Sequence, residues 1–273
     1  MAAAGGNEPL IVDSDDLVHI EYHVYGSGEP AVVLIHGWLC NSRYWQAQLD
    51  ELARRYTVVT LDLAGHGASG RNRTDWSIEN FAADVAAVVR QLPARSVVLV
   101  GHAMGGPVAL AATPRIGARV LGVVGVDTFK SLGLPPPPRE QVEHELAPFR
   151  ADFIGTMHSF VPQHLFAAGA DPGLIGKVVA DMSRASPDIA IASLESLNQM
   201  DFGALLPRIH VPIVAINSDL GEPTDVARIM KAAPTFRLIT LQGSGHFLML
   251  EAPQRFNPIL LRELATLAAT PRS

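Results

Sequence analysis

Short runs of β-branched and aliphatic residues recur along the chain and predict buried strands. Four such runs lie in the first half of the sequence, at Ala31–Ile35, Tyr56–Leu61, Ser96–Val100 and Val120–Val126. The segments between them carry apolar residues at helical spacing, around Trp45–Arg55, Ile78–Leu92 and Met104–Ala112. Because strands and helices alternate, we predict a parallel sheet covered by helices on both faces.

The same alternation returns near the C-terminus. It predicts a strand at Pro212–Asn217, a helix around Thr224–Ala232, a strand at Arg237–Leu241 and a last helix from Pro253 to about Ala268. Pro253 suits the first turn of a helix, where its missing N–H group would have no partner in any case. The last quarter of the chain therefore extends the sheet begun in the first half.

Residues 131–206 interrupt this alternation. The segment opens with four consecutive prolines, Pro135 to Pro138, a stiff spacer that fits neither a helix nor a central strand. Apolar residues then recur at spacings of three and four, which is typical of helices. We predict a helical cap at 131–206, inserted into a core formed by residues 1–130 and 207–273.

Composition narrows the class of protein. The 273 residues are 48% hydrophobic and 18% charged, which excludes a disordered chain and allows a large core. The 21 Lys and Arg residues against 27 Asp and Glu residues give a net charge of -6, the wrong sign for a general nucleic-acid binder. Cys40 is the one cysteine, so an intramolecular disulfide framework and a Cys-rich zinc site are excluded.

Targeting and membrane signals are missing from the sequence pattern. Met1–Asp16 has no basic stretch followed by an apolar run, and no stretch of about 20 apolar residues occurs. We therefore expect a soluble cytoplasmic protein that does not bind a membrane and whose partner is a small-molecule substrate. No pattern in the sequence fixes the oligomeric state.

One strand-to-helix junction has the form of a catalytic turn. Gly101-His102-Ala103-Met104-Gly105 follows an apolar strand and opens a helix. Glycines on both sides of one residue allow a sharp turn, the nucleophile elbow, which lifts the central side chain above the sheet at the helix N-terminus. That residue is usually serine, but Ala103 has no nucleophilic atom. The glycines alone are equally compatible with a close strand–helix crossing.

Other segments supply the remaining parts of an acyl-transfer site. His36-Gly37-Trp38 follows the Ala31–Ile35 strand, where the backbone N–H groups of Trp38 and Met104 would form an oxyanion hole. His246 follows the last predicted strand and can reach over the sheet edge as a general base. Asp219 follows the preceding strand and is our preferred carboxylate to orient that imidazole. Asp127, after the Val120–Val126 strand, is the alternative acid.

The chain order of elbow, acid and histidine resembles that of the α/β-hydrolase fold family, over nearly the whole chain outside the cap. The turn Asp62-Leu63-Ala64-Gly65-His66-Gly67-Ala68-Ser69 also resembles one that these proteins carry. The resemblance, closest to esterase- and lipase-like members, implies an eight-stranded, mostly parallel sheet and a Ser-His-acid mechanism. It implies a serine hydrolase that acts on an ester, lactone or related acyl bond. The sequence departs from the family pattern at Ala103.

Three hypotheses account for Ala103. In the first, the chain is an inactive variant of an enzyme that carries serine at position 103, because the other parts of the apparatus are retained. In the second, the chain is a natural ligand-binding protein on a hydrolase scaffold. In the third, His246 and an aspartate catalyse as a dyad without a nucleophile, as in cofactor-independent oxygenases and some lyases of the fold.

Aromatic and sulfur side chains in the cap, with His102 beside the elbow, are candidates for contact with a small to medium, lipophilic substrate. The cap residues are Phe149, Phe153, Met157 and Phe160. Their helical spacing is also what packing of the cap against itself would produce, so this alternative stays open.

Two further motifs resemble cofactor or metal sites. Gly65–Gly70 has the spacing G-x-G-x-x-G, but no helix opens directly after it and no acidic residue ends a following strand about 20 residues on. His19 and His23 have the spacing of a helical zinc pair, but the segment around them alternates like a strand. We predict neither a cofactor nor a metal.

Overall fold

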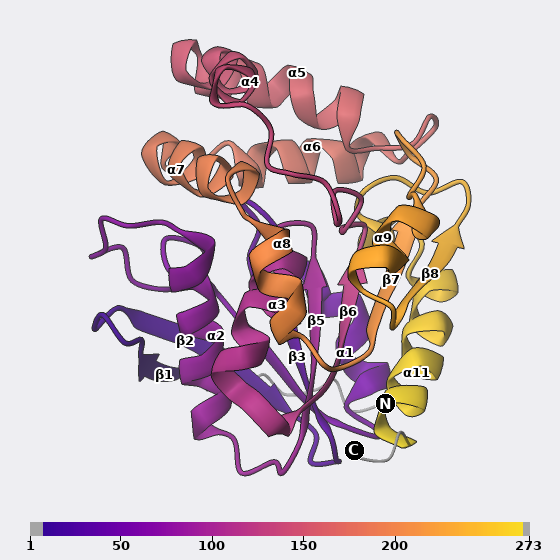
Figure 1. The fold of residues 1–273 in the computed structure, drawn as a ribbon. Coiled ribbons are helices and arrows are strands. Elements are labelled where there is room, and N and C mark those ends of the chain that lie inside the picture. The colour runs from indigo at the N-terminus through magenta and orange to yellow at the C-terminus, as the bar shows by residue number, and fades with distance from the viewer. Residues whose placement is uncertain (1–7, 270–273) are drawn as a thin grey trace.

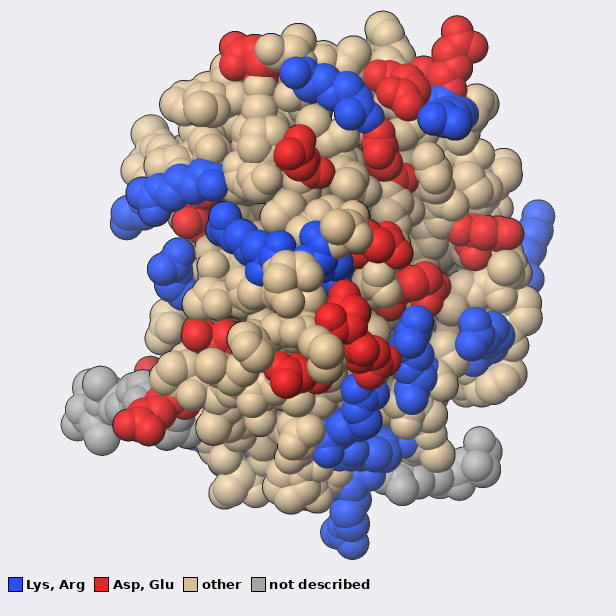
Figure 2. All heavy atoms as spheres, turned by 90° about the vertical axis from the view of Figure 1, so that its left-hand side faces the viewer, with Lys and Arg blue, Asp and Glu red and all other residues tan. Residues whose placement is uncertain are grey.

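The computed structural model describes residues 8–269. Residues 1–7 and 270–273 lie outside the described range, so the N-terminal part of the Met1–Asp16 segment, where we expect no targeting signal, is not covered. Within residues 8–269, no helix combines the length and the apolar character needed to cross a bilayer. On the side of the molecule drawn in Figure 2, acidic and basic side chains are interspersed.

A single eight-stranded sheet forms the centre of the fold (Figure 1). Its strands lie in the order β1-β2-β4-β3-β5-β6-β7-β8, and β2 runs antiparallel to β1 and β4, whereas the other neighbours are parallel. This confirms the predicted α/β class with a mostly parallel eight-stranded sheet. The strands are β1 Leu10–Asp13, β2 His19–Tyr25, β3 Ala31–Ile35, β4 Thr57–Leu61, β5 Val97–His102, β6 Val120–Val126, β7 Ile213–Ser218 and β8 Phe236–Leu241.

Helices cover both faces of the sheet, which is why its central strands are apolar without alternation. Val33 of β3 belongs to the core shared with α2 and α3, whereas its neighbour Val32 belongs to the core shared with α1 and α11. Alternate residues of one strand therefore fill different cores. The core helices are α1 Gln46–Leu52, α2 Ile78–Gln91, α3 Gly105–Ile116, α9 Val226–Ala232, α10 Leu248–Glu251 and α11 Pro253–Ala269.

Five further α-helices and the 3-10 helix Leu206–Arg208 lie between β6 and β7. The α-helices are α4 Arg139–Ala151, α5 Phe153–His164, α6 Pro172–Met182, α7 Pro187–Asn198 and the short α8 Phe202–Leu205. Figure 1 shows α4 to α7 stacked beyond one edge of the sheet, the edge at which the parallel strands end. The segment is thus helical, as its spacing predicts. Its treatment as a separate cap domain at 131–206 stays a prediction.

Candidate active site

Ala103 occupies a tight turn between β5 and α3. Its φ angle is +47°, in the left-handed region that non-glycine residues rarely adopt. A Cβ atom on Gly101 would lie 2.1 Å from the carbonyl oxygen of Gly105, and one on Gly105 would lie 2.5 Å from the carbonyl oxygen of Ile35. Both glycines are therefore required by close backbone approach, and the junction has the sharp strand–turn–helix form that its sequence predicts.

The imidazole of His246 is paired with Asp127 rather than with Asp219. Its Nδ1 lies 2.6 Å from Asp127 Oδ2. Asp127 directly follows β6 and has a φ angle of +45°. The carboxylate of Asp219, our preferred acid, instead accepts a hydrogen bond from the backbone N–H of Gly243 at 2.8 Å. The expectation for Asp219 is therefore wrong, because its carboxylate binds the backbone of the loop that follows β8, and the imidazole of His246 is paired with Asp127.

The environment of Asp127 favours its charged form. Burial raises the pKa of this carboxyl, but the hydrogen bond and charge of His246, the charge of Lys130 and the hydroxyl of Ser218 together lower the pKa to about 2. Ser218 donates from both its backbone N–H and its hydroxyl to Asp127 Oδ1, at 2.9 and 2.8 Å. With Asp127 ionised, the proton of a neutral His246 resides on Nδ1, and Nε2 is left as an acceptor.

The backbone around His246 is held by several separate segments. Its N–H donates to the carbonyl oxygen of Leu165 at 2.8 Å, and its carbonyl oxygen lies 3.0 Å from His102 Nε2. The carboxylate of Glu251 accepts hydrogen bonds from the backbone N–H groups of Gly245 and Phe247, which flank His246, at 3.0 and 3.1 Å. No sequence pattern pointed to Glu251. These contacts fix the imidazole before any substrate binds.

His102 does not lie on an open surface, contrary to the prediction that it contacts substrate. Its side chain is 1% exposed, and its Nε2 donates to the backbone of His246. Burial, together with the neighbouring His246, lowers the pKa of His102 to about 3, so the ring is neutral. His102 therefore supports the loop that carries His246.

The His36-Gly37-Trp38 loop lies against the elbow. A Cβ atom on Gly37 would be 3.2 Å from the Cβ of Ala103. The indole N–H of Trp38 donates to the carbonyl oxygen of Ala190 in α7 at 2.8 Å, which ties this loop to the overlying helices. No hydrogen bond to the backbone N–H of Trp38 or Met104 occurs within residues 8–269. The oxyanion hole that these two N–H groups would form stays a prediction.

The arrangement can be compared with known proteins. Residues 32–259 match the Alpha/beta hydrolase family. The chain belongs to this family. The matched range includes Trp38, Ala103, Asp127 and His246.

Relatives of this alpha/beta hydrolase carry different names. A Karrikin insensitive 2 receptor CA from Petunia hybrida is 26% identical over 259 residues, 88% of this chain and 94% of the receptor. A non-heme haloperoxidase from Rhodococcus erythropolis is 29% identical over 255 residues, 87% and 92% of the two chains.

Solved structures show the same fold. A thermophilic esterase from Thermogutta terrifontis has a TM-score of 0.83 at 22% identity, covering 96% of this chain and 100% of the esterase. Est816, described as an N-acyl homoserine lactone degrading enzyme, has a TM-score of 0.79 at 27% identity, covering 93% and 99%.

A cavity of about 270 Å³ opens beside the elbow of this alpha/beta hydrolase. Ala103 and Met104 are among the residues that line it. Because the Met104 side chain is only 1% exposed, this residue lies beside the cavity with its side chain buried in the core. The other lining residues come from α3, from the loop after β6 and from the end of α7 onward: Pro107, Thr128, Phe129, Ser131, Leu134, Pro135, Pro136, Pro137, Leu197, Asn198, Met200 and Phe202.

The four cap residues predicted to contact substrate do not line this cavity. Phe149, Phe153 and Met157 are buried in a core cluster, and Phe160 packs against the edge of that cluster. Phe149 also meets Trp38 edge to face, with ring centroids 5.6 Å apart. Packing of the cap, the alternative considered for these residues, accounts for their positions.

Proposed function

We propose that this alpha/beta hydrolase carries a site for cleaving a carboxylic ester, lactone or related acyl bond, and that the chain with Ala103 binds such a substrate without cleaving it. The observation that carries the proposal is the 2.6 Å contact between His246 Nδ1 and Asp127 Oδ2, next to an elbow whose central residue has a φ angle of +47°. Relatives named as an esterase and as a lactone-degrading enzyme agree with an acyl substrate.

The proposed reaction needs serine at position 103. Its Oγ attacks the acyl carbon while His246 Nε2 takes the hydroxyl proton, and the charge of Asp127 stabilises the imidazolium. The tetrahedral oxyanion accepts hydrogen bonds from the N–H groups of Trp38 and Met104. When the intermediate collapses, the bond to the leaving group breaks and His246 donates its proton to that group. Water, deprotonated by His246, then releases the acid from the serine.

Ala103→Ser is the direct test. We expect it to raise the rate of hydrolysis of p-nitrophenyl esters by a factor on the order of 10⁶, the size of effect seen when a triad nucleophile is removed. Hydrolysis should disappear again when His246→Ala is combined with it. Equal, background-level rates for the present chain and the serine variant would overturn the proposal.

Dyad catalysis is a second candidate, favoured by the fact that the His246–Asp127 pair is complete in the chain as it stands. In that case His246 Nε2 would abstract a proton from an acidic substrate with no covalent step. Oxygen uptake or elimination by the present chain, lost in His246→Ala, would support it. Tight ligand binding without either reaction, and without gain from Ala103→Ser, would favour a receptor, the role named for the Petunia relative.

A further inference from the structure

The cavity beside Ala103 has a definite position relative to the base. Ala103 and Met104 line it, whereas His246 does not. In acyl transfer the leaving group must lie within reach of the histidine, because the histidine gives it a proton. The part of the substrate that extends away from His246 is therefore the acyl part, which the cavity is placed to receive.

The lining is uncharged and mostly apolar. Of the fourteen residues around the cavity, none is Asp, Glu, Lys, Arg or His, and only Thr128, Ser131 and Asn198 carry polar side chains. A charged group transferred there would lose part of its hydration without gaining an ionic partner among the lining residues. The cavity therefore favours an uncharged hydrocarbon-rich group.

The volume indicates how large a group the cavity can hold between its walls. Because a cavity of about 150 Å³ holds benzene, with six heavy atoms, 270 Å³ holds roughly eleven heavy atoms. Three consecutive prolines, Pro135 to Pro137, form part of the wall, and their fixed φ angles restrict its adjustment to a larger ligand.

We propose that this cavity is the acyl-binding site, and that it selects substrates with an uncharged acyl group of up to about ten heavy atoms, such as hexanoyl to octanoyl or phenylpropanoyl esters. This assignment rests on the proposed acyl hydrolysis. It names the substrate class of that site and identifies Leu197 and Met200 as determinants of acyl length.

Binding to the present chain tests the assignment without catalysis. Calorimetric titration with p-nitrophenyl acetate, hexanoate, octanoate and dodecanoate should show dissociation constants that fall about fourfold per methylene up to octanoate and then stop falling. The p-nitrophenyl monoester of adipic acid, whose acyl group ends in a carboxylate, should bind at least tenfold more weakly than the hexanoate. Affinity that keeps rising to dodecanoate, or equal binding of the charged ester, would overturn the assignment.

Two tryptophan variants test the location. Leu197→Trp narrows the cavity, whereas Leu174→Trp, the matched control, changes a half-buried leucine in a separate hollow beside α6. We expect Leu197→Trp to lower the ratio of octanoate to acetate affinity about tenfold and Leu174→Trp to leave it unchanged. Met200→Ala should shift the longest well-bound ester toward dodecanoate, a gain that a misfolded variant cannot produce. Equal ratios in both tryptophan variants, with no shift from Met200→Ala, would place the acyl group elsewhere.

Kinetics in the Ala103→Ser background separate this inference from the proposed function. There, Leu197→Trp should change selectivity among acyl chains but not among acetates of different alcohols. If the serine variant hydrolyses esters without this dependence, the acyl-site assignment fails and the proposed function stands. If selective binding is found but the serine variant is inactive, the proposed function fails and the acyl assignment falls with it, because a non-catalytic site does not distinguish acyl from leaving group.

Discussion

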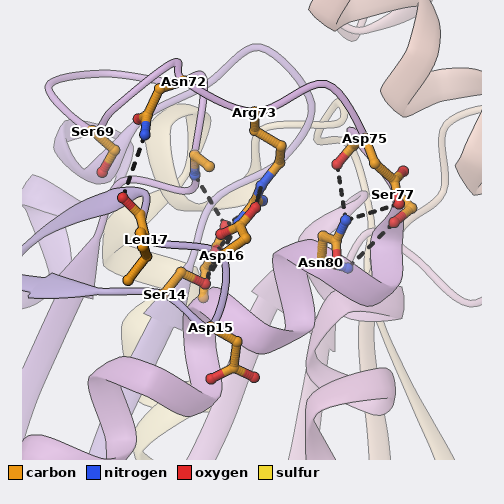
Figure 3. A network of polar contacts seen from close by, with 12 residues as sticks. Ser14, Asp15, Asp16, Leu17, Ser69, Asn72, Arg73, Asp75, Ser77 and Asn80 are labelled. Atoms are coloured by element: carbon orange, nitrogen blue, oxygen red, sulfur yellow. Dashed lines mark hydrogen bonds and ion pairs between the residues drawn. The ribbon is translucent and has the colours of Figure 1, made fainter.

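Two polar clusters in the same molecule are built in opposite ways. In the first, the side chain of Arg73 is 2% exposed and forms ion pairs with Asp16 and Asp84. Figure 3 shows Arg73 reaching toward Asp16. Its guanidinium makes two hydrogen bonds to each carboxylate, at 2.7 and 2.9 Å and at 3.0 and 2.6 Å. Asp84 also accepts from the Ser14 hydroxyl and the backbone N–H of Ala64. Each charged group in this cluster therefore has an oppositely charged hydrogen-bond partner, because the two carboxylates share the Arg73 guanidinium.

The second cluster, around His246, contains polar atoms without a hydrogen-bond partner. We call it the open cluster, and the cluster around Arg73 the saturated cluster. Within residues 8–269, the backbone N–H groups of Trp38 and Met104 donate to no internal acceptor, and the buried Nδ1 of His102 has no hydrogen-bond partner either. Unpaired polar groups at a buried site cost stability, and side chains outside this cluster, such as Tyr44 and Gln48, carry them as well.

Backbone strain is concentrated around the second cluster. Five non-glycine residues have positive φ angles among the described residues: Leu17, Leu39, Ala103, Asp127 and Phe129. Leu17 directly follows Asp16 of the first cluster, whereas each of the other four is an elbow, acid or cavity residue or adjoins the Trp38 loop. The charged groups of the first cluster all have hydrogen-bond partners, whereas the site proposed for catalysis combines unpaired donors with strained backbone.

The largest expected effect tests the pairing at the open cluster. In the Ala103→Ser background, Asp127→Asn should lower the rate of ester hydrolysis about 10⁴-fold, because the amide cannot hold His246 in the tautomer that leaves Nε2 free. Asp219→Asn is the matched control and should change the rate less than twofold. If Asp219→Asn lowered the rate of hydrolysis more than Asp127→Asn does, our assignment of the acid would be reversed.

The next effect breaks the saturated cluster. Arg73→Ala leaves Asp84 as a buried charge without its cation and should lower the free energy of unfolding by about 3–5 kcal/mol. Arg90→Ala, which removes an exposed ion pair with Asp15, should cost at most about 1 kcal/mol. Urea unfolding measures both values. Per folded molecule, Arg73→Ala in the serine background should hydrolyse esters at the unaltered rate, and a large loss there would erase the distinction between the clusters.

Much of the fold follows from the sequence because burial on both faces leaves a clear apolar run. The strand at Val120–Val126 was predicted with its observed bounds, and the strand at Ala31–Ile35 likewise. The four-residue β1 carries no comparable signal, because it lies at the sheet edge and is largely exposed.

The acid could not be chosen from the sequence. Asp127 and Asp219 both follow ends of neighbouring parallel strands, so the pattern places either near His246. The choice depends on the positive φ of Asp127 and on Ser218, which donates to its carboxylate. The positive φ angle of Asp127 cannot be predicted from the type of residue at that position. Helical spacing in the cap likewise could not separate packing residues such as Phe149 from cavity residues such as Leu197.

A smaller effect concerns acid stability at the open cluster. The pKa of Asp127 in the folded protein, about 2, lies below the unfolded value near 3.9. Its ionisation therefore stabilises the fold above pH 4, by about 2 kcal/mol, and this contribution is lost as the pH falls toward 2. Unfolding free energies of the present chain and of Asp127→Asn should differ more at pH 5 than at pH 2.5. A difference independent of pH would contradict the low pKa.

The smallest effect measures the strain at the elbow. Ala103 costs about 1 kcal/mol or more by adopting a positive φ, and glycine removes this cost while adding about 0.5–1 kcal/mol of unfolded-state entropy. Ala103→Gly should thus leave the free energy of unfolding unchanged or raise it by about 0.5 kcal/mol. The same substitution at Ala180, an exposed position inside α6, should lower it by about 0.5–1 kcal/mol because the backbone there is already relaxed. Equal losses at both positions would mean that the elbow stores no strain, and the open cluster would then differ from the saturated one in its hydrogen bonds alone.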